Sequence, residues 1–255
     1  MTARDALAAE AVPERASRSI PRDGMVERRG AGLWLSHAGL ILGVLVIVFP
    51  IWLAFVASTV TQPEIVRPPM PLLPGPHLID NYTRALFSGV NVPVFTMLFN
   101  SLVMALGIAL GKIFISILSA FAVVFFRFPL RMVFFWLIFV TLMLPVEVRI
   151  LPTYKGMVDL GMIDTYAGLI LPLIASATAT LLFRQFFLTI PAELVEAARI
   201  DGAGPLRFLK DILLPLSKTN IAALFVILFI YGWTQYLWPL LVTNDNQMNT
   251  IVIAL

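Results

Sequence analysis

Five long apolar stretches constrain this chain more than any other feature of its sequence. About 20 apolar residues in a helix cross the hydrocarbon core of a bilayer, and each stretch reaches that length. Of all residues, 59% are hydrophobic and only 13% are charged, whereas in a soluble domain about 25% are charged. The sequence therefore predicts an all-α, polytopic bundle of transmembrane helices over residues 33–255, with spans at about 33–60, 95–126, 132–151, 166–187 and 220–241.

The lysines and arginines are divided unevenly between the loops that join these spans. With the N-terminus in the cytoplasm, 13 of the 18 fall on the inner side and 4 on the outer side, while Lys112 lies within a span. Cytoplasmic loops carry the excess of positive charge in membrane proteins. Residues 1–32 are thus predicted to be a disordered cytoplasmic tail, and the proline-rich residues 62–93 an extended outer loop with little regular structure.

The same count of spans places Leu255 outside, at the start of a further apolar run, TIVIAL. We therefore expect a sixth span to be missing from the C-terminal end.

Several kinds of chemistry are excluded by the residues present. The chain has no cysteine and only two histidines, so thiolate sites and multi-histidine metal centres are not expected. The segment GIALGK (107–112) imitates a phosphate-binding loop, but it has one residue too few between its glycines and Ile113 follows the lysine. Gly107 and Gly111 instead predict a small-residue face for close helix packing. Lys112 is interpreted either as a structural ion-pair partner or as part of a transport path.

One charged segment, ELVEAARIDGAGPLRFLKDILLPLSK, interrupts the apolar sequence on the predicted cytoplasmic side. Pro191 and Pro205 each favour the start of a short helix, and Gly202 is expected in the left-handed conformation that ends the first one. Pro215 is expected to end the second helix or to kink it into the next span. Each helix has one apolar face. In the first helix this face is formed by Leu194, Ala197 and Ala198, and in the second by Leu206, Leu209, Ile212 and Leu213. The small side chains of the first face favour close packing in a groove on a partner protein over contact with a lipid surface.

The spacing within this segment resembles a known cytoplasmic motif. It reads EAA, three residues, Gly, nine residues, I-x-L-P, and resembles the motif of permease subunits of ABC-type importers. That resemblance implies a type I importer permease fold and a segment, 191–215, that docks on a separate ATPase. It implies coupling roles for Glu196, Ala197, Ala198, Asp201, Gly202, Ile212, Leu214 and Pro215.

Further stretches are similar to the carbohydrate-importer branch related to the maltose permeases, and most of all to the second permease subunits of sn-glycerol-3-phosphate importers. They are FRFPLR (126–131), LMLPVEVRI (142–150), ASATATLLFRQFF (175–187) and YGWTQYLWPLL (231–241). The resemblance implies a bacterial inner-membrane protein that forms half of a path for glycerol-3-phosphate, a related polyol phosphate or a sugar. The implied partners are a homologous permease, two ATPase subunits that hold ATP and Mg²⁺, an outer substrate-binding protein and membrane lipid, but no nucleic acid. No cofactor is expected in this chain.

Two groups of residues are candidates for the translocation path. Tyr231, Gln235 and Trp238 recur at helical spacing in the fifth span and suit a polyol, although an aromatic belt at the membrane interface is the alternative. Glu147 and Arg149 follow Pro145, where the third span can unwind; Arg149 could face a phosphate, or the two residues could form an outer gate or a local ion pair. The rival function, an ATP-independent secondary transporter or channel, leaves the charged segment unexplained.

Overall fold

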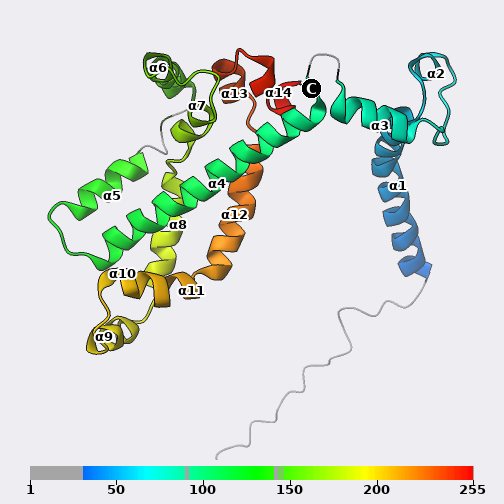
Figure 1. Cartoon of the computed structure of the whole chain (residues 1–255). Coiled ribbons are helices and arrows are strands. Elements are labelled where there is room, and N and C mark those ends of the chain that lie inside the picture. The colour runs from blue at the N-terminus through cyan, green and yellow to red at the C-terminus, as the bar shows by residue number, and fades with distance from the viewer. Residues whose placement is uncertain (1–30, 90–91, 141–143, 145, 255) are drawn as a thin grey trace, which may run out of the picture. The chain divides into compact units, whose positions relative to one another are not determined.

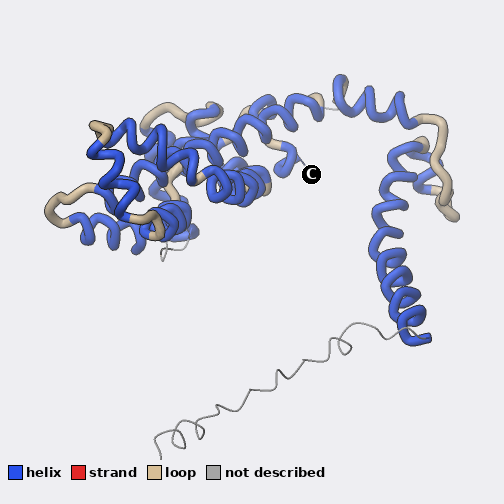
Figure 2. Tube along the Cα trace, turned by 90° about the horizontal axis from the view of Figure 1, so that it is seen from below, coloured by secondary structure: helices blue, strands red, loops and turns tan. Residues whose placement is uncertain are grey.

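The computed structural model describes residues 31–89, 92–140, 144 and 146–254 (Figure 1). Every regular element among them is helical, which confirms the all-α prediction, and no strand occurs in this part of the chain (Figure 2). The predicted tail, apart from its last two residues, lies outside the described residues. The chain divides into two compact units, Met1–Leu78 and Ile79–Leu255.

In the first unit, α1 (Ala31–Thr59) is a single apolar helix long enough to cross a membrane. The chain then turns back onto the end of this helix. The Trp52 indole donates to the Leu72 carbonyl at 3.0 Å, and the Gly75 amide donates to the Thr59 hydroxyl at 2.7 Å. The tightness of the turn demands glycine, because a Cβ on Gly75 would lie 2.8 Å from the Thr59 carbonyl oxygen.

The predicted outer loop contains more helix than the sequence indicated. Residues Gln62–Val66 form α2, and Leu78–Phe87 form α3, so the expectation of little regular structure was wrong for these parts. In α2, Thr61 and Glu64 form a capping box that satisfies the first free amides, with a proline in the first turn where it costs no hydrogen bond. Residues 67–77 between the two helices carry no regular structure, as expected.

In the second unit, α4 (Val94–Phe125) is the central helix and packs mainly against α8 and α12 (Figure 1). The other elements, in chain order, are α5 (Arg131–Val140), α6 (Val146–Asp159), α7 (Tyr166–Ile170), η1 (Leu171–Leu173), α8 (Ala177–Leu188), α9 (Ala192–Ile200), α10 (Pro205–Phe208), η2 (Leu209–Leu213), α11 (Leu214–Leu216), α12 (Lys218–Trp233), α13 (Leu237–Val242), η3 (Asn246–Met248) and α14 (Ile251–Ala254).

Three of the five predicted spans are not the continuous helices that their hydropathy indicated. The third is divided between α5, which ends at Val140, and α6. The fourth is a pair, α7–η1 and α8, bent by 50°, and the fifth breaks after Trp233 before α13. Within the described ranges, two helices are long and apolar enough to cross a membrane, or up to four if each bent pair counts as one span. Hydropathy predicts where the chain is apolar, whereas prolines and local caps decide where each helix ends.

Small residues allow the central helices to approach closely. A Cβ on Gly107 would lie 2.6 Å from Ile170, and one on Gly111 would lie 2.5 Å from Ile174, so the predicted packing face is confirmed. Gly232 of α12 meets the backbone of Ala105 in the same way. Two buried clusters result: one joins α4, α8, α12 and the segment from α9 to η2, and the other joins α4, α7 and α13.

Candidate coupling segment and translocation-path residues

The charged segment folds into the helix, turn and helix that the sequence predicted. Helix α9 begins directly after Pro191, which occupies the N-cap position, and ends before a left-handed glycine, since Gly202 has φ +74°. The Ala203 amide donates to the Ala198 carbonyl at 2.8 Å, and the Gly202 amide donates to the Arg199 carbonyl at 3.0 Å. This pattern is a Schellman motif, which satisfies carbonyls that a helix end leaves free.

The second helix is less regular than expected. It begins at Pro205, as predicted, but passes through the π-helical turn η2 before α11. Residues Pro205–Leu216 then meet α12 at an angle of 74°. The buried Ser217 hydroxyl donates to the Leu213 carbonyl at 2.6 Å at this bend, two residues after Pro215. The segment is therefore joined to α12 through a defined kink.

Burial divides the predicted coupling residues into two sets. Ala198 is 4% exposed and packs in the core of the chain itself, together with Phe208, Leu209 and Leu213. Of the predicted small face, only Ala198 packs inward against α4 and α8, so it is not available to a partner groove. Ile212 and Leu214 are half-buried against the same core, while Glu196, Ala197, Asp201, Gly202 and Pro215 are exposed. The exposed surface also carries Leu194, Ile200 and Leu206, of which the last two are 86% and 77% exposed.

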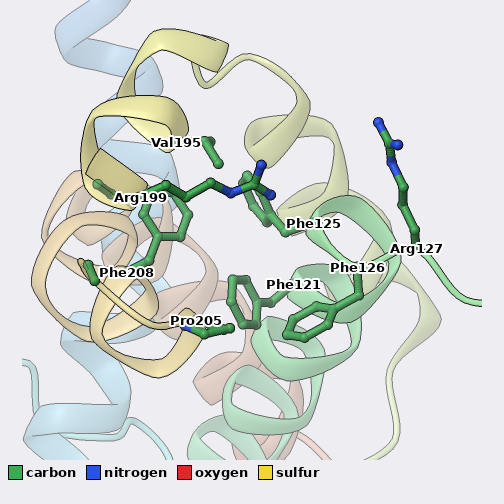
Figure 3. Close-up of a pocket in the computed structure, with 10 residues that line it drawn as sticks. Phe121, Phe125, Phe126, Arg127, Val195, Arg199, Pro205 and Phe208 are labelled. Carbon is green, nitrogen blue, oxygen red and sulfur yellow. The ribbon is translucent and has the colours of Figure 1, made fainter. Parts of the chain in front are cut away.

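A cavity of about 480 Å³ lies between the end of α4 and the pair α9–α10 (Figure 3). Phenylalanine rings from both sides line it, and the rings of Phe125 and Phe208 meet edge to face at 5.3 Å. Arg199 and Arg127 also contribute to its lining. This cavity was not predicted from the sequence, although the run of phenylalanines at 121, 125 and 126 could have indicated a contact surface.

The three path candidates of the fifth span do not share one helix face. Tyr231 lies on α12, Gln235 lies in the break where its amide donates to the Tyr231 carbonyl at 3.1 Å, and Trp238 lies on α13. Trp238 is 4% exposed, and its indole donates to the Gly168 carbonyl at 3.1 Å. The predicted common face was wrong because the helix ends at Trp233, and Trp238 is a core residue of the second cluster.

The charged candidates Glu147 and Arg149 lie on α6, and Lys112 lies on α4. Arg149 is exposed on α6, whose Ile150 and Tyr154 pack against the same buried cluster as Tyr231. The backbone of Glu147 belongs to α6, while its side chain lies outside the described part of the structure. Lys112 is 6% exposed, and its ammonium lies 3.7 Å from the centroid of the Tyr231 ring. Among the side chains that the structure describes, no carboxylate forms the ion pair with Lys112 that one interpretation required.

Sequence reasoning overlooked Asn100, a buried amide near the start of α4. Its Nδ2 donates to the carbonyls of Gln247 and Asn249, and its Oδ1 accepts from the Tyr166 hydroxyl at 2.6 Å. The neighbouring Ser101 hydroxyl accepts from the Ile251 amide. Asn100 and Ser101 thus fix η3 and α14 to α4. A polar pair at the start of an apolar span was the signal that could have identified them.

Residues 112–255 match the family model described as binding-protein-dependent transport system inner membrane component. This chain belongs to that family, as the permease subunit of an ABC-type importer and not as a catalytic subunit.

Individual relatives refine this assignment. The chain is 70% identical over 235 residues to the sn-glycerol-3-phosphate transport system permease protein UgpE of Rhizobium meliloti (strain 1021), covering 91% of this chain and 83% of that protein. Identity is 69%, with the same coverage, to the protein of that name from Brucella abortus (strain 2308), and 59% over 234 residues to the one from Escherichia coli O1:K1 / APEC, again covering 91% and 83%.

A solved structure supports the fold. A chain from the crystal structure of a bacterial ABC transporter involved in the import of the acidic polysaccharide alginate superimposes with a TM-score of 0.73 at 24% identity. The match covers 88% of this chain and 79% of that one.

Proposed function

We propose that this chain forms half of the translocation path for sn-glycerol-3-phosphate, or for a closely related polyol phosphate, in the inner membrane of a bacterium. In the proposed complex it pairs with a homologous permease, two ATPase subunits and an outer substrate-binding protein. ATP and Mg²⁺ are bound by the ATPase subunits. The N-terminus is cytoplasmic in this proposal, which the 13-to-4 distribution of lysine and arginine supports.

The observation that carries the substrate proposal is the identity of 59–70% over 91% of this chain to permeases named for sn-glycerol-3-phosphate transport. These relatives come from several different bacteria, and the aligned region includes the whole coupling segment and the spans around it.

The geometry of residues 191–215 supports the proposed coupling to an ATPase. Its outward surface presents the apolar side chains of Ile200 and Leu206 beside exposed polar residues, as expected of a helix pair that seats in a protein groove. Its inward surface packs on α4 and α8, and its end continues into α12 through the 74° bend. When a closing ATPase moves this segment, the movement would therefore be transmitted to α4, α8 and α12 as a rigid-body displacement.

Reconstitution of the complete complex in proteoliposomes tests the proposal. With ATP inside and loaded binding protein outside, we expect labelled sn-glycerol-3-phosphate to be taken up and nucleotide hydrolysis to be stimulated. Maltose, offered with the same binding protein, is the control substrate and should not accumulate. Uptake that needs an ion gradient and proceeds without ATP would instead support the secondary-transporter alternative.

A further inference from the structure

We propose that Lys112 and Arg149 form an anion site that binds the phosphate group of the substrate as it crosses the membrane. This inference rests on the proposed function, because it assigns a binding role to two residues of that path. Its basis is the environment of Lys112, an ionisable side chain at membrane depth. Such residues are costly in a bilayer and commonly mark a substrate path or a paired charge.

Lys112 is buried within the helix bundle without a compensating negative charge among the side chains that the structure describes. It is 6% exposed and lies on α4 between the buried residues Ile108 and Ile113. Its described contact is the face of the Tyr231 ring, 3.7 Å away. A cation over an aromatic face gains about 0.5–2 kcal/mol, whereas desolvating an ammonium costs several kcal/mol. The ring therefore stabilises the side chain only in part, and leaves its charge uncompensated.

A second cationic side chain makes this imbalance larger. Arg149 on α6 acts electrostatically on Lys112, and both groups are cationic. Two like charges, one of which is buried, repel each other unless an anion lies between them. A phosphate carries up to two negative charges and three acceptor oxygens, which suit an ammonium and a guanidinium together.

The placement of the two cations also suits a site that a substrate can reach. Arg149 is exposed on its helix, while Lys112 is buried, so an anion attracted by the first would meet the second deeper in the bundle. Tyr231 of α12 and Ile150 and Tyr154 of α6 pack against the same buried cluster, so the ring beside Lys112 and the helix that carries Arg149 meet in one region. Anion-selective pathways in membranes use arginine and lysine in this manner.

The alternative is that Lys112 has a purely structural role, as the cationic partner of Tyr231. The two roles differ in what must be preserved. A structural contact requires the aromatic face as much as the ammonium, whereas an anion site requires the positive charge, and the ring contributes less. Variants at both positions therefore separate them.

The test measures uptake of labelled sn-glycerol-3-phosphate by the reconstituted complex. Lys112→Met should lower uptake by about tenfold or more, as expected for the loss of a charged contact to a buried ligand group. Lys112→Arg should retain most of the uptake, and Tyr231→Leu should reduce it less than Lys112→Met does. Lys155→Met on α6 is the matched control, because it removes the same charge from an exposed position. Each complex is first checked for co-purification of the ATPase subunits, so that misassembly is recognised.

A second measurement uses the absence of native cysteine from this chain. In a complex whose other subunits carry no reactive thiol, Lys112→Cys should have low uptake. A methanethiosulfonate reagent that attaches an aminoethyl group should restore uptake, while the sulfonatoethyl and methyl reagents should not. Excess sn-glycerol-3-phosphate should also slow the labelling of this cysteine during turnover.

Equal uptake by Lys112→Met and Lys155→Met would overturn the anion site, as would an equal loss in Lys112→Met and Tyr231→Leu. Restoration by the neutral methyl reagent would also overturn it, because charge would then be irrelevant. If the unmodified complex imported no sn-glycerol-3-phosphate at all, the proposed function itself would fail, and this assignment would fail with it.

Discussion

Helices α1 and α4 have similar composition but very different surroundings. Both are apolar and long enough to cross a membrane, and α1 is the more hydrophobic of the two. Yet only 6% of the apolar window of α1 is buried within the described chain, against 50% of that of α4. Both helices also carry two glycines four residues apart. Those of α4 are packed against Ile170 and Ile174, whereas a Cβ added to Gly39 or Gly43 of α1 would meet no atom within 4 Å.

What distinguishes α4 is that polar residues are buried along its length, whereas in α1 Thr59 at the end of the helix is the buried polar residue that the structure describes. Asn100, Ser101, Lys112 and Ser116 are all buried in α4, and each of the first two bonds to a segment far along the chain. Polar groups at membrane depth must find partners within the protein, since lipid offers none. Hydrophobicity and small residues thus identify a membrane helix, while buried polar residues identify the helix around which the others assemble.

The largest expected effect comes from filling a glycine contact at the centre of the second unit. Gly232→Leu would place a Cβ 2.9 Å from the Ala105 Cα, a backbone atom that cannot yield without moving α4. Overpacking of this kind costs about 1–3 kcal/mol or more, so we expect a strong loss of folded protein in detergent and a lower melting temperature. Gly43→Leu on α1 is the matched control and should leave both unchanged. Equal stability of the two variants would show that the α4–α12 contact is not as close as described.

Asn100→Leu should have the next largest effect. The substitution leaves the carbonyls of Gln247 and Asn249 and the hydroxyl of Tyr166 without their partner, at a cost of about 1–3 kcal/mol for each group that stays buried and unpaired. We expect η3 and α14 to detach from α4, measurable as faster proteolysis or hydrogen exchange after Thr243. His37→Leu on α1 provides the comparison, because His37 is exposed and bonds to Leu33 of its own helix. Unchanged exchange in Asn100→Leu would contradict the role given to this residue.

Gly202→Val is expected to disturb coupling more than stability. With φ at +74° a β-branched residue is strained by about 1–2 kcal/mol, although no atom lies within 4 Å of the added Cβ. The turn between α9 and α10 should therefore change without disrupting the core. We expect ATP hydrolysis by the complex to continue while uptake per ATP falls. Gly204→Ala, at φ −70° with equally open space, should keep normal coupling. Normal uptake per ATP hydrolysed in the Gly202→Val complex would show that this turn is not needed for coupling.

The sequence predicted the local turns and helix ends of the coupling segment, but it did not predict which distant helices pack together. Gly202, Pro205 and the bend near Pro215 were predicted because each depends on local backbone preferences that one residue type carries. The inward packing of Ala198 and the burial of Trp238 were not predicted, since both depend on which distant helix lies opposite. The breaks at Ile174–Ser176 and Thr234–Tyr236 also escaped detection, because each lies inside a stretch that is apolar enough overall to be assigned as a single span.

The smallest expected effect is a change in the pKa of Glu64, an exposed residue in the first turn of α2, the short helix that follows α1. The pKa of Glu64 is lowered, first by the hydrogen bond from the Thr61 hydroxyl and then by that from the Thr61 amide, at 2.7 and 2.8 Å. A lowered pKa in the folded state means that this capping interaction contributes above the ordinary pKa of a glutamate and is lost as pH falls through the lowered value.

Thr61→Val removes only the hydroxyl contribution, so the pKa of Glu64 should rise part of the way to its usual value in an NMR titration of the carboxyl carbon. Thr61→Ser should leave it low. Because Thr61 and Glu64 belong to the first unit, neither change should alter the thermal stability of the second unit. Gly232→Leu, in contrast, should lower it. An unchanged pKa in Thr61→Val would mean that the amide alone holds the carboxylate, and that the capping box acts through the backbone.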